Sequence, residues 1–352
     1  MQFPILLPNI FNHPFTYESN LNLSVGDFVE VPFGASRKIG VVWNEFEKKN
    51  EKNFKIKKII KKLDIPKLNI KTLNFLNWFS EYNLISKGMA LKMTLLSGKP
   101  VGKFEDKFYK VFQIEKKKNL YHLTKDQKIS LNEINNSNQN FNVHVLQGTT
   151  GSGKTIVYFE ALKVVLKKGH QGLIMLPEIG LTNQFEKKFF EFFGMEPAIW
   201  HSGISKKNKE IIWSGIVTGK IKVVIGARSA LFLPFKKLGL IIVDEEHDQS
   251  YKQDEGIIYN ARDMAISRAS FENIPINLIT AVPSVETFQN IKKKKYKLSK
   301  LENRYQNASL PNHEVIDLNN AKMEKQSWIS NEIIEKVNVH LKKKDQILFF
   351  LN

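Results

Sequence analysis

The segment GTTGSGKT at positions 148–155 has the residue types and the spacing of a phosphate-binding loop. Its glycines allow backbone N–H groups to converge on phosphate oxygens, Lys154 can reach the β and γ phosphates, and the Thr155 hydroxyl can bind Mg²⁺. A glycine-rich turn with only a structural purpose is the alternative, and the strand-like run before the segment and the helical pattern after it argue against it. We therefore predict that ATP and Mg²⁺ bind here, at Gly148, Thr149, Thr150, Gly151, Ser152, Gly153, Lys154 and Thr155.

An acidic cluster, DEEH at positions 244–247, follows a short apolar run. Asp244 is expected to hold Mg²⁺ together with Thr155, and Glu245 to orient and polarise the water that attacks the γ phosphate. Glu245 and Lys154 are therefore the predicted catalytic residues. His247 is expected to report hydrolysis to a later motif. Taken alone, such a cluster is more often a solvated acidic turn, and its position after a strand in a chain with a phosphate loop favours the nucleotide site.

Upstream of the phosphate loop, Leu123 and Thr124 precede Gln127. We predict that Gln127 reads the adenine base, as a glutamine at this place does in many motors that move on nucleic acid.

The phosphate loop and the acidic cluster are far apart in the sequence, so the fold must bring their side chains together. Apolar runs alternate with longer helical stretches, and this alternation indicates an α/β fold in which helices cover both faces of a parallel sheet. Ligands collect at the carboxyl ends of the strands in such sheets, which is where the phosphate loop and the acidic cluster would lie. The predicted strands are 143–147, 172–176, 223–226, 240–243 and 276–279, and the helix after the phosphate loop is 155–166.

The N-terminal part of the chain has a different pattern. Residues 27–33 and 38–43 are predicted strands around a turn at Gly34, and residues 68–82 are a predicted amphipathic helix that faces this small β unit. The pattern dissolves between 98 and 120, which predicts a linker. The predicted domains are a β-rich domain at 1–97, the linker at 98–120, an α/β lobe at 121–305 and a further segment at 306–352.

Composition limits the class of protein. The chain has 53 Lys and Arg against 35 Asp and Glu, a net charge of +18, which favours a polyanionic partner or else reflects a general bias toward lysine. The absence of cysteine excludes disulfides and thiolate zinc sites, so no zinc is expected. No apolar run approaches the roughly 18 residues of a membrane helix, and prolines interrupt the first twenty residues, so we expect a cytoplasmic protein with no membrane partner.

Seven further strings resemble one family, the PriA replication-restart helicases. They are VPFG (31–34), LPEIGLTNQ (176–184), HSG (201–203), GARSALFLPF (226–235), DEEHDQSYKQ (244–253), YNARD (259–263) and PSVE (283–286). The resemblance implies a P-loop helicase lobe preceded by a small β-rich DNA-binding domain. It also implies an ATP-dependent motor that moves three-prime to five-prime on single-stranded DNA and recognises forked DNA and D-loops. Its implied partners are primosome proteins and single-stranded DNA-binding protein.

The same resemblance assigns roles to further residues. In the N-terminal domain, Phe15, Gly34 and Lys57 would capture the three-prime end of a DNA strand. In the motor lobe, Ala281 and Pro283 would couple hydrolysis to movement together with His247. The residues implied in gripping the tracked strand are Thr182, Arg228, Ser229 and Arg262.

Some positions depart from the family pattern. Thr16 stands where the family has Asp, and its hydroxyl is a weaker acceptor than a carboxylate for a terminal three-prime OH. Ile258 and Asn260 stand where the family has Arg and His, which predicts weaker coupling of DNA binding to ATP hydrolysis. Val282 replaces a hydroxyl residue, so a buried hydrogen bond is expected to be lost there. The linker is too short for the family's winged-helix domain, and the chain stops where the second motor lobe begins, which predicts ATP binding, weak hydrolysis and little unwinding.

The sequence alone leaves three hypotheses of function open. The first is an ATP-dependent DNA helicase of the restart primosome. The second is a non-enzymatic module that binds DNA ends and docks to the primosome, with a decayed motor. The third is a fragment that another chain completes.

Overall fold

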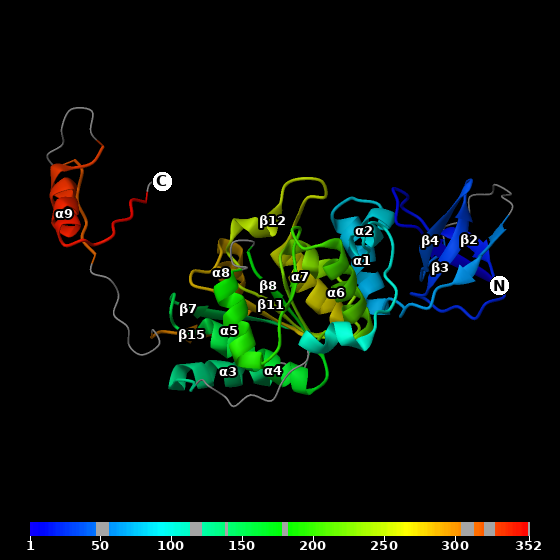
Figure 1. The fold of residues 1–352 in the computed structure, drawn as a ribbon, viewed down its shortest axis with the longest axis horizontal. Coiled ribbons are helices and arrows are strands. Elements are labelled where there is room, and N and C mark those ends of the chain that lie inside the picture. Colours follow the sequence, from blue (N-terminus) through cyan, green and yellow to red (C-terminus); the bar gives the residue numbers. More distant parts are fainter. Residues whose placement is uncertain are drawn as a thin grey trace. The chain divides into compact units, whose positions relative to one another are not determined.

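The computed structural model describes residues 1–46, 56–112, 122–137, 140–177, 182–303, 313–319 and 328–350. The chain divides into two compact units, Met1–Asn307 and Ala308–Asn352 (Figure 1). In the described part of the second unit, the helix α9 (Asn331–Lys342) begins at a Ser330 cap and buries none of its own residues. The candidate site lies in the first unit.

The first unit begins with a six-stranded sheet in the order β5-β2-β1-β4-β3-β6. The predicted hairpin is confirmed as β3 (Phe28–Phe33) and β4 (Ser36–Val42), which pair antiparallel. Gly34 in its turn has φ +60°, a left-handed conformation that favours glycine. The other strands were not predicted because they are short or interrupted by proline: β1 (Gln2–Leu6), β2 (Phe15–Glu18), β5 (Lys57–Lys58) and β6 (Lys61–Lys62).

A seven-stranded sheet in the order β15-β7-β14-β11-β8-β10-β9 follows, and all its strand pairs are parallel. The predicted parallel α/β sheet is thus confirmed, and each of the five predicted runs forms a strand: β7 (Asn142–Gly148), β8 (Gln171–Met175), β10 (Val223–Gly226), β11 (Leu238–Val243) and β14 (Pro275–Thr280). The two edge strands were missed, β9 (Ala198–Trp200) because it is short and β15 (Lys297–Leu301) because lysines interrupt it.

Both faces of this sheet are buried. Successive residues of a strand point to opposite faces, and neighbouring residues of one strand belong to different apolar clusters. In β11, Ile241 belongs to one apolar cluster and Ile242 to the other, and Leu173 and Ile174 of β8 alternate in the same way. The helices α3 (Lys125–Ser137), α4 (Lys154–Lys167) and α5 (Asn183–Phe193) cover one face, while α6 (Lys206–Thr218) and α7 (Ala261–Glu272) cover the other (Figure 1).

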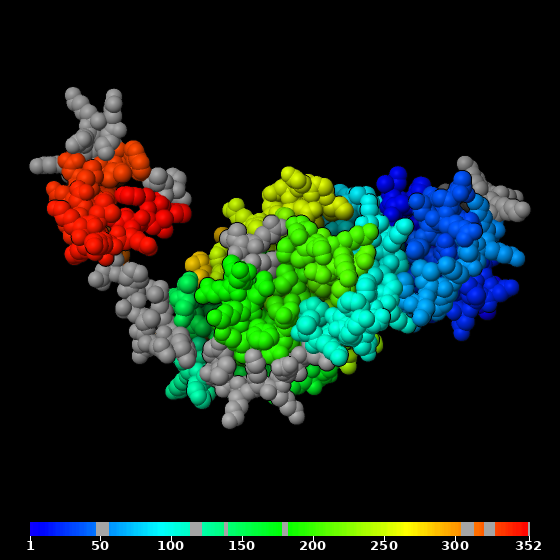
Figure 2. All heavy atoms as spheres, in the orientation of Figure 1, coloured from blue at the N-terminus to red at the C-terminus, as the bar shows by residue number. Residues whose placement is uncertain are grey.

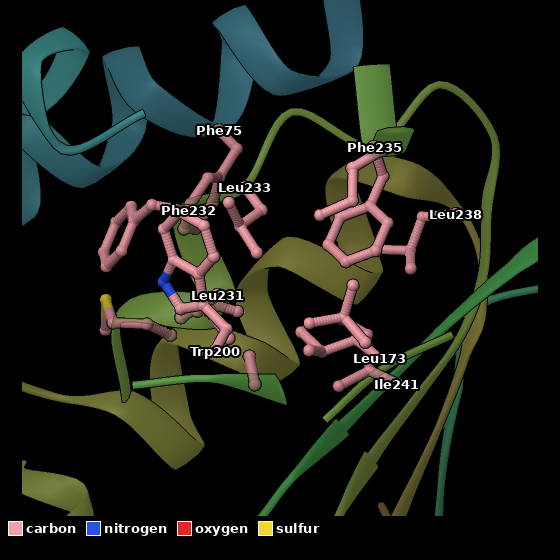
Figure 3. Packing of buried hydrophobic residues seen from close by; sticks show 14 of the residues in the cluster. Phe75, Leu173, Trp200, Leu231, Phe232, Leu233, Phe235, Leu238 and Ile241 are labelled. Atoms are coloured by element: carbon pink, nitrogen blue, oxygen red, sulfur yellow. The ribbon is translucent and has the colours of Figure 1, made fainter. Parts of the chain in front are cut away.

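The helix α1 (Ile70–Tyr82) joins the two sheets. It was expected to face the small β unit, and on that side Asn77 does accept a hydrogen bond from the Trp43 indole, 3.0 Å. On the opposite side, however, the rings of Phe75 and Phe79 lie 6.0 and 4.9 Å from the ring of Phe232 in the second sheet's layer. Figure 3 shows Phe75 beside Phe232 and Leu233, above Leu173 and Ile241. The prediction was therefore incomplete, because a helix that is apolar on two sides can pack between two layers.

Part of the predicted linker is also packed. Residues Asp106–Phe112 form a 3₁₀ helix, and its Tyr109 is buried, with its hydroxyl 3.1 Å from the Ser214 hydroxyl of α6. Figure 2 shows this cyan segment lying against the green part of the chain. Residues 113–120 of the predicted linker lie outside the described residues. Among the described helices, none has the length and apolar character needed to cross a membrane.

We predict that Phe79→Ala lowers the free energy of unfolding by about 3–5 kcal/mol, because it removes a fully buried ring between α1 and the second sheet's layer. The measurement is urea unfolding followed by circular dichroism. Tyr82→Ala is the matched control on the same helix, since Tyr82 is 64% exposed, and should cost less than about 1 kcal/mol. Equal losses in the two variants would contradict the packing role of Phe79.

A second prediction concerns His144 in β7. Burial lowers the pKa of His144 to about 4, although Glu133 opposes this shift. Below pH 6.5 the unfolded chain therefore binds a proton that the folded chain does not, so stability falls as the pH falls, by about 3 kcal/mol near pH 4.

His144→Gln should remove this part of the pH dependence. The measurement is the free energy of unfolding at pH 7.5 and at pH 4.5, with the exposed His122→Gln as the control. The prediction is wrong if wild type and His144→Gln lose the same stability between the two pH values.

Candidate functional site

The phosphate loop lies between the end of β7 and the start of α4, as its sequence requires. Gly151 and Gly153 both have φ +83°, where other residues are strained. A Cβ at Gly148 would come within 2.6 Å of the Ser152 hydroxyl, so the loop also needs glycine for space. No side chain among the described residues caps the N-terminus of α4, and its first N–H groups are thus available to an anion.

Lys154 lies inside the curve of this loop. Its side chain is only 9% exposed, and its ammonium donates hydrogen bonds to the carbonyls of Gly148 at 2.7 Å and Thr149 at 3.4 Å. The ammonium is therefore tied to the backbone at the start of the loop.

Asp244 and Glu245 follow β11 directly, so they lie at the same edge of the sheet as the loop that follows β7. The Tyr158 hydroxyl of α4 donates to Asp244 Oδ2 at 2.8 Å, which ties the acidic cluster to the helix of the phosphate loop. Burial raises the pKa of Asp244 to about 6, while the Tyr158 hydrogen bond and Lys154 oppose the shift. A bound cation would offset the cost of burying this charge.

Glu245 has an unusual backbone. Its φ is +46°, a left-handed conformation that is uncommon outside glycine, and its N–H donates to Asp244 Oδ1 at 3.0 Å. Strained residues of this kind concentrate at functional sites. The turn directs the Glu245 side chain away from Asp244 and to within 3.7 Å of the His247 ring nitrogen.

His247 contacts the segment that was predicted to couple hydrolysis to movement. Its Nδ1 lies 2.8 Å from the Thr280 hydroxyl, and that hydroxyl donates to the Val282 carbonyl at 2.7 Å, so Nδ1 carries the proton in this arrangement. The predicted loss of a buried hydrogen bond at Val282 is wrong, because Val282 is 70% exposed and Thr280, which is fully buried, supplies a hydroxyl instead. Ala281 lies between these two residues, and Pro283 follows them.

Glu246 points in a third direction, into the interior. Its buried carboxylate accepts hydrogen bonds from the Ser284 N–H at 2.8 Å, from the Thr287 hydroxyl at 2.9 Å and from the Arg262 guanidinium at 3.2 Å. Arg262, predicted to bind DNA, is only 6% exposed and also pairs with Asp263. Its position does not agree with a DNA contact, because its charge is already paired inside the fold.

Gln127 is buried against the phosphate loop. Its amide nitrogen donates to the Ser152 carbonyl at 2.9 Å, and its amide oxygen accepts from the Thr124 N–H at 3.0 Å. A Cβ at Gly153 would come within 2.3 Å of this amide. Gln127 therefore supports the loop, and its predicted contact with adenine stays a prediction.

Three residues predicted to grip DNA lie after strands β8 and β10. Thr182 caps α5, while Arg228 and Ser229 begin the 3₁₀ helix Arg228–Phe232, and Arg228 donates to the Lys252 carbonyl at 2.8 Å. Thr182 and Ser229 are exposed. Residues 178–181, within one of the family-like strings, lie outside the described residues.

Ile258 and Asn260, which depart from the family pattern, flank Tyr259 before α7. Ile258 is 63% exposed, whereas Asn260 caps α7 by accepting the Arg262 N–H at 3.0 Å. Asn260 thus has a structural role here.

An aromatic cluster lies in the N-terminal sheet beside the Gly34 turn. The Phe15 ring is 5.3 Å from that of Phe33, 5.2 Å from that of Phe11 and 4.8 Å from that of His13. Lys57 is exposed on the neighbouring strand β5. The structure therefore brings the predicted Phe15 and Gly34 together with three rings that were not predicted. The aromatic side chains at the alternate positions 11, 13 and 15 were the feature of the sequence that could have predicted this cluster.

Tyr158 and Thr280 were also missed. Tyr158 lies three residues after Thr155, on the same face of a helix, and that spacing was a usable signal. Among the described residues, no group of three or more His, Cys, Asp or Glu could hold a metal by itself. Thr155 and Asp244 fit Mg²⁺ only as part of a nucleotide complex.

Comparison with known proteins gives two family matches. Residues 4–96 match the PriA 3'DNA-binding domain (3'BD), and residues 124–291 match the DEAD/DEAH box helicase. Replication restart protein PriA of Rickettsia conorii is 43% identical over 355 aligned positions, which cover 99% of this chain and 53% of that protein. The same protein of Haemophilus influenzae is 42% identical over 212 positions, which cover 60% and 29%.

Among solved structures, that of RecG bound to three-way DNA junction matches with a TM-score of 0.40 and 23% identity, over 58% of this chain and 26% of that one. The chain spans about half the length of the Rickettsia relatives it matches. With a match to the 3'DNA-binding domain followed by a match to the DEAD/DEAH box helicase, and with this likeness along 99% of its length, the chain resembles the PriA replication restart proteins.

Proposed function

We propose that this chain is the ATP-binding and DNA-binding part of a replication-restart helicase that moves three-prime to five-prime on single-stranded DNA. The observation that carries the proposal is the 2.8 Å hydrogen bond between Tyr158 of the phosphate-loop helix and Asp244. This bond ties α4, which carries Thr155, to the end of β11, which precedes Asp244, and so supports a Mg²⁺ site that these two residues share.

In the proposed reaction, the loop N–H groups and Lys154 bind the phosphates of ATP. Thr155 and Asp244 would hold Mg²⁺, which would neutralise charge on the transferring phosphoryl group. Glu245 orients the attacking water, and the strained backbone of Glu245 fixes the direction of its side chain. His247 then connects the site to the 280–283 segment through Thr280, so a change at the γ phosphate can alter the position of that segment.

The proposed DNA contacts begin at the aromatic cluster of Phe11, His13, Phe15 and Phe33. Aromatic faces stack on nucleobases without regard to sequence, and the exposed Lys57 can pair with a phosphate. We propose that this cluster captures the three-prime end of a strand at a stalled fork or D-loop, with the Thr16 hydroxyl near the terminal sugar. Thr182, Arg228 and Ser229 would contact the strand that the motor follows.

A non-enzymatic DNA-end binding module is the second candidate. The exposed Ile258 supports it, because the family has a charged residue there. The intact phosphate loop and the His247 to Thr280 hydrogen bond support the enzyme.

The ATPase prediction uses the 352-residue chain with and without single-stranded DNA. Lys154→Ala should abolish ATP binding, because the loop loses the charge that meets the phosphates. Glu245→Gln should still bind ATP but lower the DNA-stimulated rate by roughly 100-fold or more, since the general base is lost. Lys167→Ala, on an exposed turn of the same helix, is the matched control. A rate that DNA and both site variants leave unchanged would support the non-enzymatic module instead.

The DNA prediction compares a free three-prime hydroxyl with a three-prime phosphate on otherwise identical DNA, by fluorescence anisotropy. Phe15→Ala should weaken binding to the free end by about 1–3 kcal/mol, the contribution of one stacked base. Phe46→Ala removes an exposed ring outside the cluster and should leave binding unchanged. If Phe15→Ala weakens both DNA substrates equally, the cluster does not recognise the strand end.

A further inference from the structure

Tyr158 is a buried tyrosine whose hydroxyl lies inside the nucleotide site. Its side chain is fully buried in α4, one helical turn after Thr155, and its hydroxyl donates to Asp244 Oδ2 at 2.8 Å. Burial and the Asp244 carboxylate raise the pKa of Tyr158, whereas a hydrogen bond with the Thr155 side chain lowers it. Tyr158 thus contacts both residues that are expected to bind Mg²⁺.

The Asp244 carboxylate is held at each of its oxygens. Oδ1 accepts the Glu245 N–H at 3.0 Å, and Oδ2 accepts the Tyr158 hydroxyl at 2.8 Å. The backbone is held as well, because the Tyr251 hydroxyl donates to the carbonyls of Asp244 at 2.6 Å and Met175 at 3.0 Å. Each oxygen keeps a further lone pair, and the plane of the carboxylate is fixed.

Two other tyrosines that are almost fully buried, Tyr109 and Tyr251, have a different kind of partner from Tyr158. The Tyr251 hydroxyl donates to backbone carbonyls, and the Tyr109 hydroxyl to a serine. These are neutral acceptors that satisfy a buried hydroxyl without touching a charge. Tyr158 donates to a carboxylate, which makes a stronger and more directional bond.

We propose that Tyr158 is a positioning residue for the magnesium nucleotide, which orients the Asp244 carboxylate so that its free lone pairs face the Thr155 hydroxyl. The inference rests on the proposed ATP site and names a residue that the phosphate-loop and acidic motifs do not contain. Groups that hydrogen-bond to metal ligands commonly change metal affinity by 10–100-fold when they are removed. Without this bond the Asp244 carboxylate is freer to rotate, and it must lose that freedom each time the metal binds, which lowers the affinity for the metal.

The test is Tyr158→Phe, which keeps the buried ring and removes only the hydroxyl. MgCl₂ is titrated into the 352-residue chain with a fluorescent ADP analogue, and the affinity for the analogue is also measured in EDTA. We expect the Mg²⁺ concentration at half-saturation to rise roughly 10-fold, with the affinity in EDTA unchanged. Tyr109→Phe, the matched loss of one buried hydroxyl far from the site, should change neither value.

A double-mutant cycle gives an independent reading. In an Asp244→Asn background, Tyr158→Phe should have no further effect on the Mg²⁺ titration, because Tyr158 acts through the carboxylate. The inference is overturned if Tyr158→Phe has the wild-type half-saturation, or weakens ADP binding equally with and without Mg²⁺. If the wild type itself shows no Mg²⁺ dependence, the proposed nucleotide site fails as well.

Discussion

The site depends on a constraint of parallel sheets, in which the carboxyl ends of all strands meet at one edge. β7 and β11 are separated only by β14, so the loops that follow them lie together although they are far apart in sequence. Helices cover both faces of the sheet, and α4 both covers one face and follows directly on the phosphate loop.

Four consecutive residues at the end of β11 point to four different parts of the site. Asp244 contacts the phosphate-loop helix, Glu245 turns away through a left-handed backbone, Glu246 binds Arg262 and Ser284 in the interior, and His247 contacts Thr280. These contacts start from one short turn and join the acidic cluster to α4, to α7 and to the 280–284 segment.

The N-terminal sheet is attached to this frame by α1 and by the packed segment before α3. The α1 rings are inserted between the two layers, and Asn69 and Lys71 at its start donate to the carbonyls of Phe235 and Glu272. Apolar and polar contacts thus fix the helix on both sides. An aromatic cluster that binds a strand end would therefore be carried by the same compact unit as the nucleotide site.

The amino-acid sequence by itself determined the parallel α/β sheet, the N-terminal hairpin and the positions of the phosphate loop and acidic cluster, because these depend on local periodicity and on glycines at fixed spacing. It did not determine what the buried polar groups contact. Arg262 was expected on the surface and lies in the interior, Val282 was expected in the interior and lies on the surface, and Tyr158, Thr280 and Phe33 were not recognised. Only the tertiary structure decided these, because a polar side chain in a packed core binds whichever partner another strand or helix brings to it.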